Sequence, residues 1–156
     1  MRRGDQATGP AGSAVRWRQR PLPALAEALR LVTWTRLMLS LRRAATLRRR
    51  IARLPVRQAP DLGDLRVVAW AVAATARLVP GASCLTQAMA GQAMLARRGI
   101  ASEVRISLPR DAAAGLAPHA WLQCGSTILL GGTQAEARAH RTLAIYDCDG
   151  TTRGAA

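Results

Sequence analysis

The sequence predicts an α+β domain in which helices come first and a small antiparallel sheet follows. Apolar residues recur at helical spacing from residue 22 to residue 98, which is typical of amphipathic helices. After Gly99 the spacing of apolar residues changes from 3.6 to 2, which is typical of strands. The length of 156 residues, 49% of them apolar, suits one domain with its own core. Helices followed by strands indicate the α+β class.

The helical part divides at two proline- and glycine-containing segments. Residues 22–54 predict one long or two shorter amphipathic helices with a basic face, which we expect to pack on the core with solvated arginines. The alternative is a docking or membrane-surface helix. After a linker over 55–63, Asp64 is expected to cap a second helix, which Pro80 and Gly81 end. A third helix begins at Ser83 or Cys84 and runs to Arg98.

The strands are expected at 103–108, 119–124, 127–130 and, as a last short strand, 143–146. The sequence predicts a loop over residues 109–118 and a turn at Gly125-Ser126. Residues 1–20 are expected to form a flexible basic arm, and residues 21–150 one domain, helical over 21–98 with its sheet over 101–147. Residues 151–156 are expected to be a frayed tail.

The net charge is +14, and all 23 basic residues are arginine. Arginine pairs bidentately with carboxylates and phosphates, so an acidic peptide, a nucleic acid or an anionic membrane surface is a plausible partner. A composition that favours arginine everywhere explains the charge equally well. We expect no nucleic acid partner, because the chain carries no nucleic-acid-binding motif and few aromatic residues.

Three cysteines, without a CxxC pair, argue against a disulfide framework, and with only two histidines a zinc site is not expected. We therefore expect no metal and no cofactor. The longest charge-free apolar run, 67–76, is about half of what a membrane span requires. The sequence thus predicts a protein of the reducing cytoplasm that is not an integral membrane protein.

Cys84 and His119 are the candidate catalytic residues. Ser83 is a good helix N-cap, which puts Cys84 in the first helical turn, where unpaired N–H groups and the helix dipole favour an anion such as a thiolate. His119 begins a predicted strand and shares its face with Trp121 and Gln123. A cysteine at a helix start and a histidine on a following strand can meet across one helix–sheet interface, as a thiolate–imidazolium pair requires. A lone cysteine in an apolar helix is nevertheless more often a small core residue.

The order of three segments carries a resemblance to a known family. These are Cys84-Leu85, the helix end Arg-Arg-Gly-Ile over 97–100, and His-Ala-Trp over 119–121. Over residues 64–130 the chain resembles the transglutaminase-like, papain-like core of the lasso peptide leader peptidases, the B proteins of lasso peptide biosynthesis, in their stand-alone form. The resemblance implies an antiparallel sheet packed on the helix whose N-terminus bears the nucleophile.

The resemblance also implies a cysteine protease that removes the leader from a ribosomally made precursor, with Cys84 as nucleophile and His119 as general base and acid. Its expected partners are the precursor leader, a small leader-recognition protein and an ATP-dependent macrolactam cyclase. Two other functions stay open: a transglutaminase-type acyltransferase that uses the same thioester, and a non-catalytic peptide-binding protein.

The family usually has an aspartate that orients the histidine, and here that position falls at or near Gly131. Asp147, Asp149, Gln123, a backbone carbonyl or a water are the candidates for holding the ring instead. Cys124 and Cys148 are expected to be structural, since Cys148 lies between two carboxylates that disfavour a thiolate. His140 is expected to be exposed to solvent.

Overall fold

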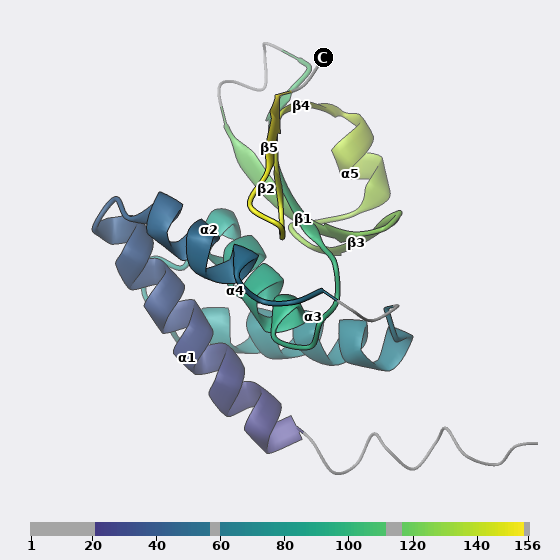
Figure 1. Ribbon diagram of the computed structural model, residues 1–156. Coiled ribbons are helices and arrows are strands. Elements are labelled where there is room, and N and C mark those ends of the chain that lie inside the picture. The colour runs from purple at the N-terminus through teal and green to yellow at the C-terminus, as the bar shows by residue number, and fades with distance from the viewer. Residues whose placement is uncertain (1–20, 57–59, 112–116, 155–156) are drawn as a thin grey trace, which may run out of the picture.

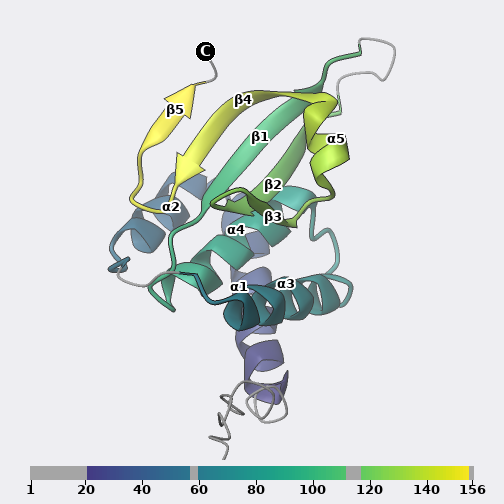
Figure 2. The same ribbon diagram turned by 90° about the vertical axis from the view of Figure 1, so that its right-hand side faces the viewer.

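The computed structural model describes residues 21–56, 60–111 and 117–154 and confirms the predicted α+β class. Four helices precede the sheet, and they gather on one side of it, while a fifth, short helix lies apart from them (Figures 1 and 2). The expected basic arm over 1–20 lies outside the described residues, as does the end of the expected tail, 155–156.

Two helices, α1 (Pro21–Ser40) and α2 (Ala44–Ala52), form where one long or two shorter helices were expected. The chain breaks between them at Arg42, which has a φ of 54°. The expectation that they pack on the core is confirmed, since α1 packs against α3 and α4 and α2 buries Leu47 and Ile51. Glu27 of α1 fixes this packing further, because its carboxylate bonds Arg97 at 2.8 Å and Arg98 at 2.9 Å at the end of α4. The expectation of solvated arginines is wrong for Arg48, which is partly buried against the sheet.

The next helix, α3 (Leu62–Ala76), is capped by Asp61, so the prediction that Asp64 caps it is wrong by one turn. Asp61 has the extended backbone that an N-cap requires, and its side chain accepts the N–H of Asp64 at 3.3 Å. Asp64 lies in the first turn instead, where its negative charge still complements the helix dipole.

Helix α4 (Cys84–Ala96) is the central element of the core, with ten buried residues. Gly91 lets it approach the sheet closely, because a Cβ at this position would come within 2.5 Å of Leu122 and 2.9 Å of Leu130. Next to it, buried Gln92 donates from Nε2 to the carbonyls of Ser102 at 3.2 Å and Tyr146 at 2.9 Å. These contacts fix α4 against both halves of the sheet.

The sheet is antiparallel with the order β3-β2-β1-β4-β5 (Figure 2). Its strands are β1 (Glu103–Pro109), β2 (His119–Cys124), β3 (Thr127–Leu130), β4 (His140–Asp147) and β5 (Thr152–Gly154). The strand expected over 143–146 is therefore longer, and it pairs with β1 along its length apart from one irregularity after Ile106.

The prediction of a frayed tail over 151–156 is wrong for residues 152–154, which form β5 on the free edge of β4. Arg153 holds this strand in place, because its guanidinium bonds Asp147 at 2.9 Å and Glu103 at 3.0 Å. The composition of residues 152–154 does not predict a strand, because the strand forms through contacts across the sheet.

The expected sheet region also contains a helix, α5 (Gln134–Arg138), between β3 and β4. A capping box starts it: the Thr133 side chain accepts the N–H of Glu136, and the Glu136 carboxylate accepts the N–H of Thr133 at 2.7 Å. This helix packs against β4.

Candidate active site

Cys84 is the first residue of α4, as the sequence predicts. Ser83 is the N-cap, and its hydroxyl oxygen accepts the N–H of Thr86 at 3.3 Å. The Cys84 side chain is half-buried and packs against the edge of the core. A sulfur at this place lies beside the outward-pointing amides of the first helical turn, which stabilise negative charge.

The other two cysteines lie in poorer places for a nucleophile. Both are buried, and Cys124 donates its S–H to the carbonyl of Ala101 at 3.2 Å. Burial raises the pKa of the Cys124 thiol, and the nearby Cys148 raises it further. Cys84 is therefore the most accessible of the three thiols.

His119 is the first residue of β2, and its ring is held by the backbone of the residue at which the family's aspartate was expected. Its Nε2 bonds the carbonyl oxygen of Gly131. A carbonyl oxygen can only accept, so Nε2 carries the ring proton in the neutral imidazole and Nδ1 carries the lone pair. The Gly131 carbonyl thus takes the place of the carboxylate in setting the tautomer of His119.

The side-chain candidates for this orienting role are engaged elsewhere. Asp147 pairs with Arg153, Asp149 accepts from Thr151 at 2.8 Å, and Gln123 donates to the carbonyl of Gly125 at 2.6 Å. Of the alternatives that the sequence leaves open, the backbone carbonyl is the one that the structure selects.

Trp121 fixes the other side of the His119 ring. The two rings meet edge to face with their centroids 4.4 Å apart, and the indole Nε1 donates to the Ser107 hydroxyl at 2.6 Å. Trp121 is buried, so the wall against which His119 rests is rigid. The prediction that Trp121 shares the face of His119 is confirmed.

His140 joins this ring cluster, which corrects the expectation that it is exposed. It is half-buried, its ring lies 5.3 Å from Trp121 and 6.2 Å from His119, and its Nδ1 bonds the carbonyl of Glu136 at 2.8 Å. Because β1 pairs with both β2 and β4, it brings the first residues of these two strands to one end of the sheet. This pairing could not be read from the local sequence.

The charges of both histidines act on the carboxylate of Glu136. The backbone N–H and the hydroxyl of Thr133 lower its pKa most, and the charges of His119 and His140 lower it further. Glu136 is therefore ionised at neutral pH. Sequence reasoning missed this residue, although the Thr-x-x-Glu capping pattern over 133–136 could have placed it.

A cleft of about 200 Å³ lies beside the ring cluster, between the sheet and α5. Its floor includes Trp121 and Ser107, and Arg105 and Arg138 give it basic walls. Its remaining lining residues are Gln123, Ile128, Gln134, Ala137 and Thr142. Most of the residues that line the cleft are therefore polar or charged.

Helix α4 packs against β2, so the elements that carry Cys84 and His119 are in contact. The packed face of β2 is the one with Leu122, which meets Gly91, whereas the ring of His119 lies with Trp121. Within the described chain, no hydrogen bond joins Cys84 Sγ to His119. The structure thus brings the two elements together but leaves the His119 ring with Trp121, on the face of β2 opposite to α4. Direct pairing of the two side chains stays a prediction.

A family model for the transglutaminase-like superfamily matches residues 28–144. The chain belongs to the transglutaminase-like superfamily. Searches of curated proteins and of solved structures found no significant match. The match covers the helices from α1 onwards as well as β1 to β3 and most of β4.

A transglutaminase-like domain suggests cysteine protease or acyltransferase-type activity. None of the helices that the structure describes is both long and apolar enough to cross a membrane. In the same residues, no cluster of three or more His, Cys, Asp or Glu side chains could hold a metal ion.

Proposed function

We propose that this transglutaminase-like domain is a cysteine peptidase with Cys84 as nucleophile and His119 as general base and acid. The observation that carries the proposal is the hydrogen bond from His119 Nε2 to the Gly131 carbonyl, which leaves the basic Nδ1 for a thiol proton. Cys84 supports it from the N-terminus of α4, and membership of the superfamily supports the reaction type.

The reaction would proceed in two steps. The Cys84 thiol gives its proton to His119, and the sulfur attacks the scissile carbonyl. As the C–N bond breaks, His119 protonates the leaving amine and a thioester remains on Cys84. Water then attacks the thioester and gives its proton to His119, which releases the acid product and returns the free thiol. Amides of the first turn of α4 would stabilise both oxyanions.

The substrate in this proposal is a ribosomally made lasso peptide precursor, from which the peptidase removes the leader. The three segments at Cys84, at the end of α4 and at His119 support this choice by their resemblance to the lasso peptide leader peptidases. A small leader-recognition protein would present the precursor, and an ATP-dependent macrolactam cyclase would use the product. The reducing cytoplasm, where the nucleophilic thiol stays free, is the proposed setting.

Two alternatives use the same fold. In a transglutaminase-type acyltransferase an amine would replace water in the second step. In a non-catalytic peptide-binding partner of the same pathway the thioester would not form, and the missing carboxylate at Gly131 favours this alternative.

Cleavage of the precursor, reconstituted with the leader-recognition protein, tests the proposal. Cys84→Ala and His119→Ala should each lower the cleavage rate by at least about 10³-fold, whereas Cys148→Ala, which removes a buried thiol, should not. A normal rate with Cys84→Ala would exclude the mechanism. Mass spectrometry of the products separates hydrolysis from amine transfer, and precursor binding without any cleavage by the wild-type chain would favour the non-catalytic alternative.

A further inference from the structure

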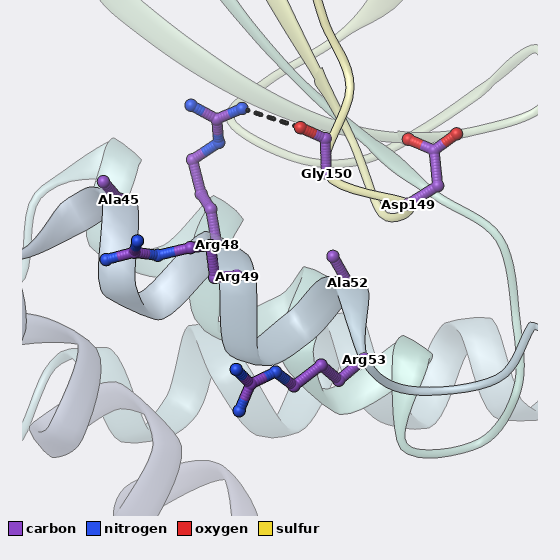
Figure 3. Close-up of a pocket in the computed structure, with 7 residues that line it drawn as sticks. All are labelled: Ala45, Arg48, Arg49, Ala52, Arg53, Asp149 and Gly150. Atoms are coloured by element: carbon purple, nitrogen blue, oxygen red, sulfur yellow. Dashed lines mark hydrogen bonds between the residues drawn. The ribbon is translucent and has the colours of Figure 1, made fainter.

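A second concave site lies between α2 and the turn that joins β4 to β5 (Figure 3). This groove has a volume of about 410 Å³. It is lined by Ala45, Arg48, Arg49, Ala52 and Arg53 of α2 and its C-terminal cap, and by Asp149 and Gly150 of the turn. We call it the arginine groove.

The sequence of α2 produces this groove directly. The five lining residues from this helix follow one another at intervals of three and one, so they share one face. Ala45 and Ala52 leave space at the floor, because their side chains end at Cβ. The opposite wall is close, since a Cβ on Gly150 would come within 2.9 Å of Ala52.

Within the described residues, Arg48 bonds the opposite wall of the groove, which the other two arginines do not. Its guanidinium donates to the Gly150 carbonyl at 3.3 Å and to the Thr152 hydroxyl, and lies 4.1 Å over the ring of Tyr146. Its Nε is buried and has no hydrogen-bond partner in the part of the chain that the structure describes. Arg48 therefore joins α2 to the sheet and adds a fixed positive charge to the floor.

Arg49 and Arg53 are exposed and are available to a ligand (Figure 3). Residues 28–60 contain nine arginines and no Asp or Glu, so the local sequence supplies no neutralising carboxylate. Among the ion pairs of the described residues, none includes an arginine of α2. The site therefore carries three positive charges against the single negative charge of Asp149.

We propose that the arginine groove binds a carboxylate-rich segment of a peptide. Arginine forks bind carboxylates bidentately, and Arg49 and Arg53 lie one helical turn apart, as neighbouring acidic side chains of one peptide require. Asp149 distinguishes a peptide from a nucleic acid strand. A peptide backbone can donate N–H groups to this carboxylate, whereas a phosphodiester backbone has no donor for it. The concave walls also differ from the flat surface that a membrane needs.

The position of the groove also predicts where the acidic segment lies in the substrate, and this step rests on the proposed peptidase function. Strand β4 runs from His140, in the ring cluster, to Asp147, next to the groove. Eight residues of strand span about 23 Å, and an extended peptide covers the same 3.3 Å per residue. An extended peptide that lies along β4 would therefore place its acidic segment about seven residues from the residue that it holds beside the ring cluster.

Fluorescence anisotropy with the full chain carrying Cys84→Ala tests the groove without any catalysis. The probes are a fluorescein-labelled peptide of alternating Glu and Gly, its Gln counterpart, and a single-stranded oligonucleotide of the same net charge as the Glu peptide. The double variant Arg49→Glu with Arg53→Glu reverses the charge of the two exposed arginines of the groove. Arg66→Glu with Arg77→Glu, on exposed sites of α3 and its C-terminal cap, makes the same change in net charge elsewhere.

We expect the Glu peptide to bind more tightly than the Gln peptide, and the groove variant to weaken it by about tenfold or more. The control variant should change its affinity by less than about twofold, and circular dichroism should show both variants folded. If both variants lost the same affinity for the Glu peptide, the binding would come from the net charge of the protein and not from the groove, and the proposal would be wrong. An oligonucleotide that binds as tightly as the Glu peptide and loses affinity in the groove variant would overturn the choice of ligand. Either failure leaves the cleavage experiment with Cys84 unaffected.

Discussion

Replacing Gly131 by Ala tests how closely the backbone that bonds His119 lies to β2. Gly131 has a φ of +102°, which L side chains rarely adopt, and such strain costs about 1–3 kcal/mol. A Cβ there would also come within 2.5 Å of the Ala120 carbonyl oxygen and 3.0 Å of Trp121 Cα. Both neighbours are backbone atoms that cannot rotate away, and such overpacking costs about 1–3 kcal/mol more. The free energy of unfolding should therefore fall by about 2–6 kcal/mol.

Urea unfolding followed by circular dichroism measures this loss, and a melting curve should show a fall in Tm of roughly 7 to 20 °C. The same reasoning predicts that Gly131→Asp, which would restore the carboxylate of the family pattern, destabilises the domain instead of improving catalysis. A new carboxylate can enter only if β2 moves away, which breaks the hydrogen bond that His119 Nε2 donates to the Gly131 carbonyl.

Two glycines provide matched controls. Gly125 also has a positive φ, of 57°, but a Cβ there would meet no atom within 4 Å, so Gly125→Ala isolates the conformational cost. Gly154→Ala has neither strain nor a clash. If Gly131→Ala lost no more stability than Gly125→Ala, the close approach of Gly131 to β2 would be refuted.

Three further predictions concern the core and the thiols. A limiting alkylating reagent should label Cys84 before Cys124 and Cys148. Cys124 should be labelled only at high pH, because burial raises the pKa of its thiol. Equal labelling rates for all three cysteines, measured by mass spectrometry, would contradict this order. Gln92→Leu leaves two buried carbonyls without a donor and should cost about 2–4 kcal/mol in urea unfolding, and a loss below about 0.5 kcal/mol would mean that water replaces the amide. Glu27→Gln removes a partly exposed ion pair to two arginines and should cost about 1 kcal/mol at low salt and less at high salt, whereas a salt-independent loss would point to packing.

The sequence predicts the parts of this fold that depend on local chemistry. The change of apolar period at Gly99 locates the boundary between helices and sheet, and Ser83 locates the start of α4. Both features follow from short stretches of chain, in which capping and periodicity act over a single turn. The same rule misplaces the cap of α3, because Asp61 and Asp64 are equally good capping residues and only the approach of the chain decides between them.

Features that depend on distant residues could not be predicted. β5 exists because Arg153 reaches Glu103 and Asp147, and the ring cluster exists because β1 lies between β2 and β4. The partner of His119 was left open for the same reason. A backbone carbonyl is among the candidates that the sequence offers, but only the pairing of β2 with β3 brings the Gly131 oxygen to the ring.

The contrast between α4 and α5 has a consequence for motion near the candidate site. α4 has ten buried residues, whereas α5 has none and is held by its capping box and its contact with β4. Its opening therefore requires far less free energy than unfolding of the domain, and its amide hydrogens should exchange well before those of α4. Since α5 forms one wall of the cleft beside Trp121, that cleft can widen for a bulky peptide while the frame that carries Cys84 stays folded.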